Sequence, residues 1–134
     1  MVVPSYRNLI AGQKARDFAA AVYRASEGFP REETSGLEAR LRRSAISVPS
    51  NNAEGQGRET PRDFMRLQSI ACGSWLEVET QLTLAARFGY IEQAPCEALL
   101  AQSAERGRIR NGLTRAPLRG ESETNHRPLA IDHC

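Results

Sequence analysis

The sequence has very few of the residues from which active sites are usually built. Only two histidines occur among its 134 residues, His126 and His133, and both lie close to the C-terminus. A di-iron helical bundle needs histidines that face its core, and serine or cysteine nucleophiles are usually activated by a histidine. The glycine motifs of phosphate-binding and dinucleotide-binding loops are absent as well. We therefore expect a protein that is not an enzyme, with no catalytic residue, cofactor, metal site or small-molecule substrate.

Cysteine and long apolar runs are also scarce. The three cysteines, Cys72, Cys96 and Cys134, are widely spaced and form no CxxC pair. This spacing argues against a disulfide framework or a zinc site and favours a reducing, cytoplasmic setting. No apolar run approaches the roughly 20 residues that span a bilayer, and no signal-peptide pattern opens the chain. We therefore expect a cytoplasmic protein with no membrane contact.

Helical periodicity fills most of the chain. Apolar side chains recur at spacings of three and four residues in four stretches, at about residues 9–27, 35–54, 61–88 and 95–112. Ser35 and Glu38 have the spacing of a capping box at the start of the second stretch. Thr60 can cap the third stretch, and Gly89 can end it. Pro49 lies inside the second stretch and predicts a kink there, because proline cannot donate a backbone hydrogen bond.

The predicted fold is all-α, an antiparallel up-and-down four-helix bundle that occupies residues 1–112. Four amphipathic helices with short connections bury their apolar rows most simply in this arrangement, and 134 residues are enough for one such domain. Residues 113–134 contain two prolines, a glycine and a polar run. This composition predicts a flexible, polar and basic C-terminal tail.

Polar side chains at helical spacing run beside the apolar rows of the second and third helices. We expect a structural polar network between these helices, formed by Arg43, Ser47, Asn51, Glu54, Ser74, Glu77 and Gln81. One hypothesis is a buried ion pair of Arg43 with Glu77 or Glu54 that fixes the helix register, and the alternative is a solvated helix edge. Trp75 follows Ser74 by one position and flanks the inward row, so we predict that Trp75 contacts another subunit.

Arginine supplies nearly all of the positive charge, with seventeen arginines against one lysine, Lys14. Because a guanidinium matches a phosphate with two parallel hydrogen bonds, arginine clusters indicate phosphate contact. The clusters in this sequence predict nucleic-acid binding by Arg40, Arg42, Arg43, Arg106, Arg108 and Arg110. The net charge of +2 is small, however, and arginine-rich codon usage or a solvated surface is the alternative explanation.

Two long segments resemble a known family of helical proteins. Residues 35–55 read SGLEARLRRSAISVPSNNAEG, which is similar to the family's G-L-x-x-Q-x-R-R-A-x-x-S-I-P-x-N-I-A-E-G signature. Residues 71–82 read ACGSWLEVETQL, similar to its A-x-G-S-x-x-E-L-E-T-Q-L segment, and FGYI at 88–91 is similar to the L-G-Y-I that follows. Over about residues 6–112 the chain thus resembles the four-helix-bundle proteins encoded in intervening sequences of bacterial 23S ribosomal RNA. It departs from the signature at Arg40, Ser44 and Asn52, where glutamine, alanine and isoleucine are usual.

The resemblance implies an up-and-down bundle that assembles into a barrel-like homopentamer and has no enzymatic activity. It also implies a relation to the accessory variability determinant of diversity-generating retroelements, which binds a reverse transcriptase and nucleic acid through a basic surface. The leading hypothesis is therefore a homopentamer that binds RNA or another nucleic acid, and the alternative is a scaffold for a polypeptide partner. A continuous positive belt on the surface favours nucleic acid, whereas a surface of mixed sign favours the scaffold.

Overall fold

The computed structural model describes the backbone of residues 6–115 and the side chains of residues 6 and 8–105. Four α-helices make up most of this part, namely α1 (Tyr6–Ala25), α2 (Leu37–Gln56), α3 (Pro61–Arg87) and α4 (Gln93–Arg115), with short 3-10 turns at Ser26–Gly28 and Arg31–Glu33. The described residues contain no strand, and the prediction of an all-α chain with four helices is confirmed. Because α4 continues to Arg115, it passes residue 112, the predicted end of the helical domain. Residues 116–134 of the predicted tail lie outside the described residues.

The ends of α3 follow the predicted chemistry. Thr60 has an extended backbone, and its Oγ1 accepts a hydrogen bond from the Asp63 amide at 3.2 Å. Pro61 occupies the first helical position, where a missing N–H costs nothing because the first amides of a helix have no partner within it. Beyond the other end, Gly89 has φ +77°, the left-handed region that glycine enters without strain. The predicted cap and terminator are therefore confirmed.

The start of α2 differs from its prediction. Gly36 precedes the first turn, and the Leu37 amide donates a hydrogen bond to Glu33 Oε2 at 2.8 Å. The capping box of Ser35 and Glu38 is therefore wrong. Glu33, from the preceding 3-10 turn, supplies the carboxylate that satisfies the helix start, and its negative charge also suits the helix dipole there.

Tyr90 ties the connection between α3 and α4 to the start of α2. Its hydroxyl donates to Glu33 Oε1 at 3.2 Å, so one carboxylate serves both the helix start and this tyrosine. The Tyr90 ring also packs against Phe29 and Phe88, with ring centroids 5.8 and 5.6 Å away. Burial, followed by the Glu33 hydrogen bond and charge, raises the pKa of Tyr90 above its usual value. The hydroxyl therefore keeps its proton and remains a donor at neutral pH.

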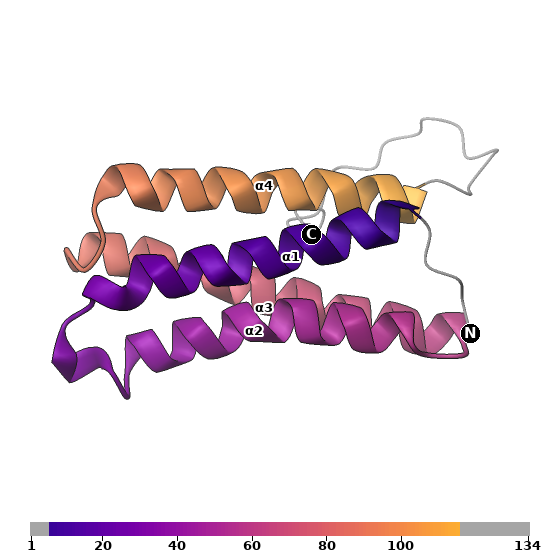
Figure 1. The fold of residues 1–134 in the computed structure, drawn as a ribbon, viewed down its shortest axis with the longest axis horizontal. Coiled ribbons are helices and arrows are strands. Elements are labelled where there is room, and N and C mark those ends of the chain that lie inside the picture. The colour runs from indigo at the N-terminus through magenta and orange to yellow at the C-terminus, as the bar shows by residue number, and fades with distance from the viewer. Residues whose placement is uncertain (1–5, 116–134) are drawn as a thin grey trace.

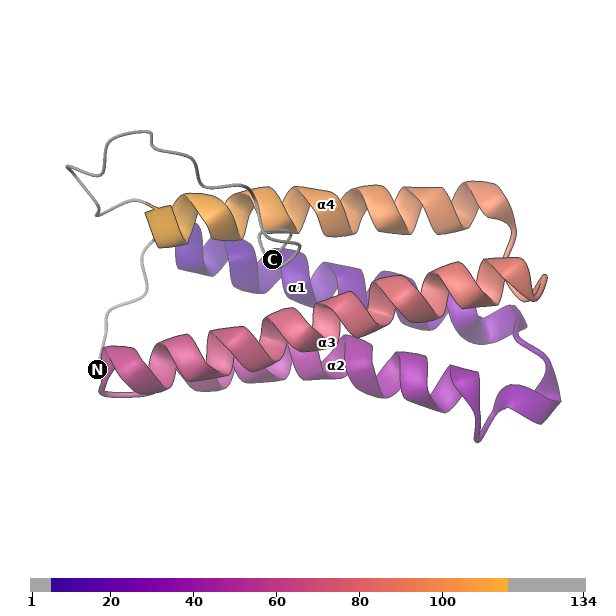
Figure 2. The same ribbon diagram turned by 180° about the vertical axis from the view of Figure 1, so that it is seen from behind.

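The four helices lie side by side along one long axis (Figure 1). α1 packs against α2 and α4, α3 packs against the same two helices, and the most extensive contact joins α2 to α3. Figure 2 shows the opposite side, where α3 lies in front of α2. α2 runs through Pro49 to its end at Gln56. The inward faces bury an apolar core that includes Ala15, Phe18, Val22, Leu41, Ala45, Val48, Trp75, Val78, Leu82 and Ala85.

Trp75 lies inside this core and not at its flank. Its side chain is 2% exposed and stacks on Phe18, with ring centroids 4.4 Å apart and an interplanar angle of 11°. The indole Nε1–H donates to Ser103 Oγ, and the Ser103 hydroxyl donates to Glu79 Oε1, which links α3 to α4. The prediction that Trp75 contacts another subunit is therefore wrong, because the chain itself covers the indole and leaves no surface for a partner.

The two cysteines of the described part, Cys72 and Cys96, differ in their bonding state. Cys96 is a buried free thiol, and burial, followed by the charge of Glu97, raises its pKa so that it stays protonated at neutral pH. Cys72 is disulfide-bonded, which departs from the expectation drawn from cysteine spacing.

None of the helices in the described part combines the length and low polarity needed to cross a bilayer. Nor do three histidine, cysteine, aspartate or glutamate side chains of this part form a group that could hold a metal ion.

Candidate interaction surface on helices α2 and α3

A row of hydrogen-bonded polar side chains joins α2 to α3. Ser47 Oγ and Ser74 Oγ lie 2.8 Å apart across the two helices. Asn51 Nδ2, one turn along α2, donates to the Ser47 carbonyl at 2.8 Å and to Ser47 Oγ at 2.9 Å. These bonds satisfy polar atoms that the helix contact partly removes from water. The structure thus brings together three members of the predicted network, Ser47, Asn51 and Ser74.

The predicted ion pair of Arg43 is wrong. Glu77 Oε2 accepts a hydrogen bond from Ser44 Oγ at 2.7 Å, and Glu54 pairs with Arg58 just beyond α2. Adjacent residues on a helix point about 100° apart, so Ser44 faces α3 while Arg43 faces solvent. A short hydroxyl therefore takes the place that the prediction gave to a guanidinium, and Glu54 forms an exposed surface pair rather than a buried one.

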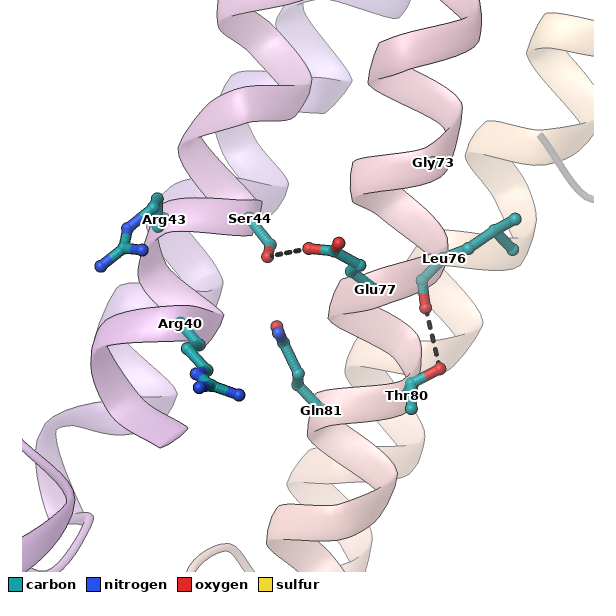
Figure 3. Close-up of a pocket in the computed structure, with 8 residues that line it drawn as sticks. All are labelled: Arg40, Arg43, Ser44, Gly73, Leu76, Glu77, Thr80 and Gln81. Carbon is teal, nitrogen blue, oxygen red and sulfur yellow. Dashed lines mark hydrogen bonds between the residues drawn. The ribbon is translucent and has the colours of Figure 1, made fainter. Parts of the chain in front are cut away.

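An open groove of about 500 Å³ lies over the contact between α2 and α3 (Figure 3). Both helices line it, through Arg40, Arg43, Ser44, Gly73, Leu76, Glu77, Thr80 and Gln81. Figure 3 shows Gln81 reaching from α3 toward α2, on the side of Arg40. Its Oε1 atom is buried and has no hydrogen-bond partner in the described part of the chain. The groove thus combines two guanidinium groups, a carboxylate and an amide, and no reactive pair of acid and base.

Arg40 and Arg43 are the two predicted arginines that the structure leaves available at this groove. Both are exposed, and their guanidinium groups form no ion pair or hydrogen bond within the described residues. Arg106, Arg108 and Arg110 lie on α4, but their side chains fall outside the described ones. The six predicted arginines are therefore not shown to form one patch.

Arg42 is part of the fold rather than of an open surface. It pairs with Glu38 at 3.1 Å, and its Nε donates to Ser26 Oγ at 2.8 Å. The guanidinium also lies over the Tyr23 ring, 4.7 Å from the ring centroid. These contacts hold α2 against α1 and use the donors that a phosphate would need. We therefore remove Arg42 from the candidate nucleic-acid contacts.

A second, longer feature was missed by the sequence reasoning. Exposed residues of α3 recur at alternating spacings of four and three, namely Arg66, Ile70, Gly73, Glu77, Thr80, Leu84 and Arg87. Phe88, one turn beyond Leu84, is 58% exposed on the same side. The sequence does contain the pattern that could have revealed this stripe. Its residues repeat with a mean period of 3.5 on a side of α3 different from the apolar row that forms the core. We call these eight residues, together with Arg40 and Arg43 on the groove rim, the α2–α3 outer face.

Comparison with known proteins places most of the described chain in one family. Residues 7–112, well over half of the sequence, match the family of 23S rRNA-intervening sequence proteins. The matched segment includes every residue of the α2–α3 outer face. No curated protein matches the chain. Because the family match covers more than half of the sequence, the chain belongs to the 23S rRNA-intervening sequence protein family.

Proposed function

We propose that the chain is a non-enzymatic interaction protein, a homo-oligomer that holds a polypeptide partner on its α2–α3 outer face. The observation that carries this proposal is the face itself, where exposed apolar side chains lie among arginines without ion pairs. Exposed apolar groups gathered on one face mark protein contacts more often than isolated ones do. The 23S rRNA-intervening sequence protein family is not a known enzyme family, which agrees with the proposal.

The body that carries this face is, in our proposal, an antiparallel up-and-down bundle with a kink at Pro49. Short connections support antiparallel neighbours, with residues 57–60 between α2 and α3 and residues 88–92 between α3 and α4. The kink is expected because Pro49 cannot donate to the carbonyl one turn earlier and its ring crowds that carbonyl. Such a body uses its inside for packing and its outside for binding.

The full chain is expected to sediment as a homopentamer of about 74 kDa, which is five times the 14.8 kDa of one chain. The resemblance of the sequence implies this number of subunits, and fivefold repetition turns a weak contact face into a multivalent one. Sedimentation velocity at micromolar concentration, with native mass spectrometry for the stoichiometry, measures it. A monomer under these conditions contradicts the proposed self-association.

The signs of the exposed charges support a polypeptide partner over a nucleic acid. α1, α2 and α3 each expose both a cation and a carboxylate, represented by Arg16 with Asp17, Arg43 with Glu54, and Arg66 with Glu77. A surface of mixed sign raises the local concentration of a polyanion less than a continuous positive belt does. It suits a partner that matches individual charges, as protein interfaces do.

RNA binding through phosphate contact is the second candidate function, and the exposure of Arg40 and Arg43 favours it. The double variant R40A/R43A is expected to lower the affinity for a structured RNA about tenfold at about 50 mM salt, and by less at about 200 mM, because each phosphate contact releases about one counterion. Filter binding measures the effect, with R16A/R24A on α1 as a control that removes the same charge. Equal retention by the unaltered protein at the two salt concentrations contradicts phosphate-led binding.

A further inference from the structure

The exposed stripe of α3 has the geometry of one half of a helix pair. Its residues from Arg66 to Arg87 alternate spacings of four and three and cover about 32 Å of helix, at about 1.5 Å per residue. A second helix that lies along such a stripe meets a side chain at every half-heptad, which is the condition for sustained packing between two helices. The stripe therefore has the length and period to seat a partner helix of about 21 residues.

The apolar side chains of the stripe lie toward its two ends, and its centre is open. Ile70 is 42% exposed on one side of the centre, and Leu84 and Phe88 are 37% and 58% exposed on the other. Between them, Gly73 has no side chain, and a Cβ built on it would meet nothing within 4 Å. A partner backbone can approach α3 at this glycine while its apolar side chains cover Ile70 and Leu84.

The described surface as a whole is of mixed sign, but the α2–α3 outer face carries more arginines than carboxylates. Four exposed arginines border it, namely Arg40, Arg43, Arg66 and Arg87, and none forms an ion pair or side-chain hydrogen bond in the described part. One carboxylate, Glu77, lies among them, and the Ser44 hydroxyl already donates to it at 2.7 Å. The partner that complements this arrangement carries carboxylates on both sides of an apolar row.

Two other occupants match the face less well. A second copy that presented the same face, as in a twofold dimer, would set these arginines against each other, and like charges across an interface cost affinity. A ring neighbour would bring a different face instead, and the sedimentation of L84S/F88S tests that contact. A nucleic acid would gain from the arginines but would place phosphates beside Glu77 and leave Ile70 and Leu84 without apolar contact. Charge and apolarity therefore both point to an acidic polypeptide with an apolar row.

We propose that the α2–α3 outer face binds an acidic amphipathic helix of another protein. Apolar side chains of that helix cover Ile70, Leu84 and Phe88, and its carboxylates face the arginines at the groove rim and at the two ends of the stripe. The inference rests on the proposed interaction function and names the chemistry of the partner. It adds a binding mode, a helix laid along an exposed helix, that the function alone does not specify.

The test uses two fluorescein-labelled helical peptides of 21 residues and the full chain. One peptide carries leucine at the heptad positions that face α3 and glutamate at the flanking positions, and the other carries lysine in place of each glutamate. Fluorescence anisotropy, with the peptide at nanomolar concentration, is expected to show micromolar binding of the acidic peptide. We expect at least about tenfold weaker binding of the basic peptide, because the four arginines repel it.

Matched variants locate the binding. R40E/R43E is expected to weaken acidic-peptide binding about tenfold, while R16E/R24E, which makes the same charge change on α1, shifts it less than about twofold. L84S/F88S is expected to weaken binding about tenfold even at high salt, because it removes apolar contact rather than charge. Circular dichroism and sedimentation establish that each variant keeps the helicity and size of the unaltered chain.

Several results overturn this inference. They are equal binding of the two peptides, equal losses in R40E/R43E and R16E/R24E, and an unchanged affinity for the acidic peptide in L84S/F88S. Dissociation of the oligomer by L84S/F88S would assign the face to a second copy, and binding of a structured RNA in place of the acidic peptide would assign it to nucleic acid. An intact oligomer that ignores the acidic peptide counts against this inference alone, whereas a monomer in sedimentation counts against the proposed function.

Discussion

The substitution Trp75→Ala is expected to lower the free energy of unfolding by about 3–5 kcal/mol, the range for truncating a large buried aromatic side chain. The loss combines the transfer of the indole out of water, the stack on Phe18 at 4.4 Å and the cavity left between α1, α3 and α4. Ser103 would also lose the indole N–H that it accepts. Urea denaturation followed by far-ultraviolet circular dichroism measures the change, at one fixed concentration because an oligomer's apparent stability depends on it.

The conservative variant Trp75→Phe separates the packing contribution from the hydrogen bond. It keeps an aromatic ring against Phe18 but removes the N–H donor and leaves a small cavity, because a phenyl ring is smaller than an indole, while Ser103 still donates to Glu79. We expect Trp75→Phe to retain the main part of the stability. The loss should be about 0.5–1.5 kcal/mol for the hydrogen bond, together with the smaller cost of the cavity. If Trp75→Ala instead left unfolding unchanged and shifted only the dissociation of subunits, the indole would be a subunit contact and its placement in the core would be refuted.

Sequence reasoning placed the helices well because their signals are local. Thr60, Pro61 and Gly89 act within one turn of a helix end, so their chemistry can be read without knowing the fold. The start of α2 was predicted wrongly because the group that satisfies it lies outside the helix and its local sequence pattern. Its carboxylate comes from Glu33, in a 3-10 turn that the helical periodicity does not reveal.

The interior positions were harder to predict, because one helix contacts two neighbours. α3 packs against both α2 and α4, so its buried arc is wider than a single stripe. Ser74 faces α2 while Trp75, about 100° further round, faces α1 and α4, and both lie inward. A prediction that assigns one inward row to each helix places only one of two adjacent residues inside. It therefore placed Trp75 at the surface once Ser74 had been assigned to the inward row.

The arginines illustrate the same limit for charged side chains. Arg40, Arg42 and Arg43 are close neighbours in sequence, yet the helix points Arg42 away from the side that Arg40 and Arg43 share. Arg42 donates to the Tyr23 carbonyl of α1 and to Ser26 Oγ in the turn that follows α1, and it becomes structural, while the other two remain exposed at the groove. The clustering in the sequence therefore predicted three exposed arginines on α2, whereas only two of them are available at the groove.

A buried amide pair near the connection of α2 to α3 is the part of the core that periodicity could not reveal. Gln68 Nε2 donates to Asn52 Oδ1 at 3.0 Å, and the two side chains are only 7% and 4% exposed. Two glycines make room for the pair, because a Cβ on Gly12 would lie 3.3 Å from Asn52 Nδ2 and one on Gly55 would lie 3.2 Å from Gln68 Nε2. The pair thus connects α2 and α3 and sits against α1.

Removing one partner of this pair is expected to cost more than removing both. Asn52→Leu leaves the Gln68 amide buried without its acceptor, and an unsatisfied buried polar group costs about 1–3 kcal/mol. The double variant Asn52→Leu with Gln68→Met replaces both amides by apolar side chains of similar volume, and we expect it to recover most of that loss.

A double-mutant cycle from urea unfolding measures the coupling between Asn52 and Gln68. We expect the double variant to be more stable than the sum of the two single changes by at least about 1 kcal/mol, because only the single variants leave a buried amide unpaired. Strictly additive losses would contradict this and would mean that water already satisfies both amides. Gly55→Ala tests the geometry separately, since its Cβ would crowd Gln68 Nε2. It should destabilise the unaltered pair more than the double variant, where the flexible thioether side chain that replaces Gln68 can bend aside.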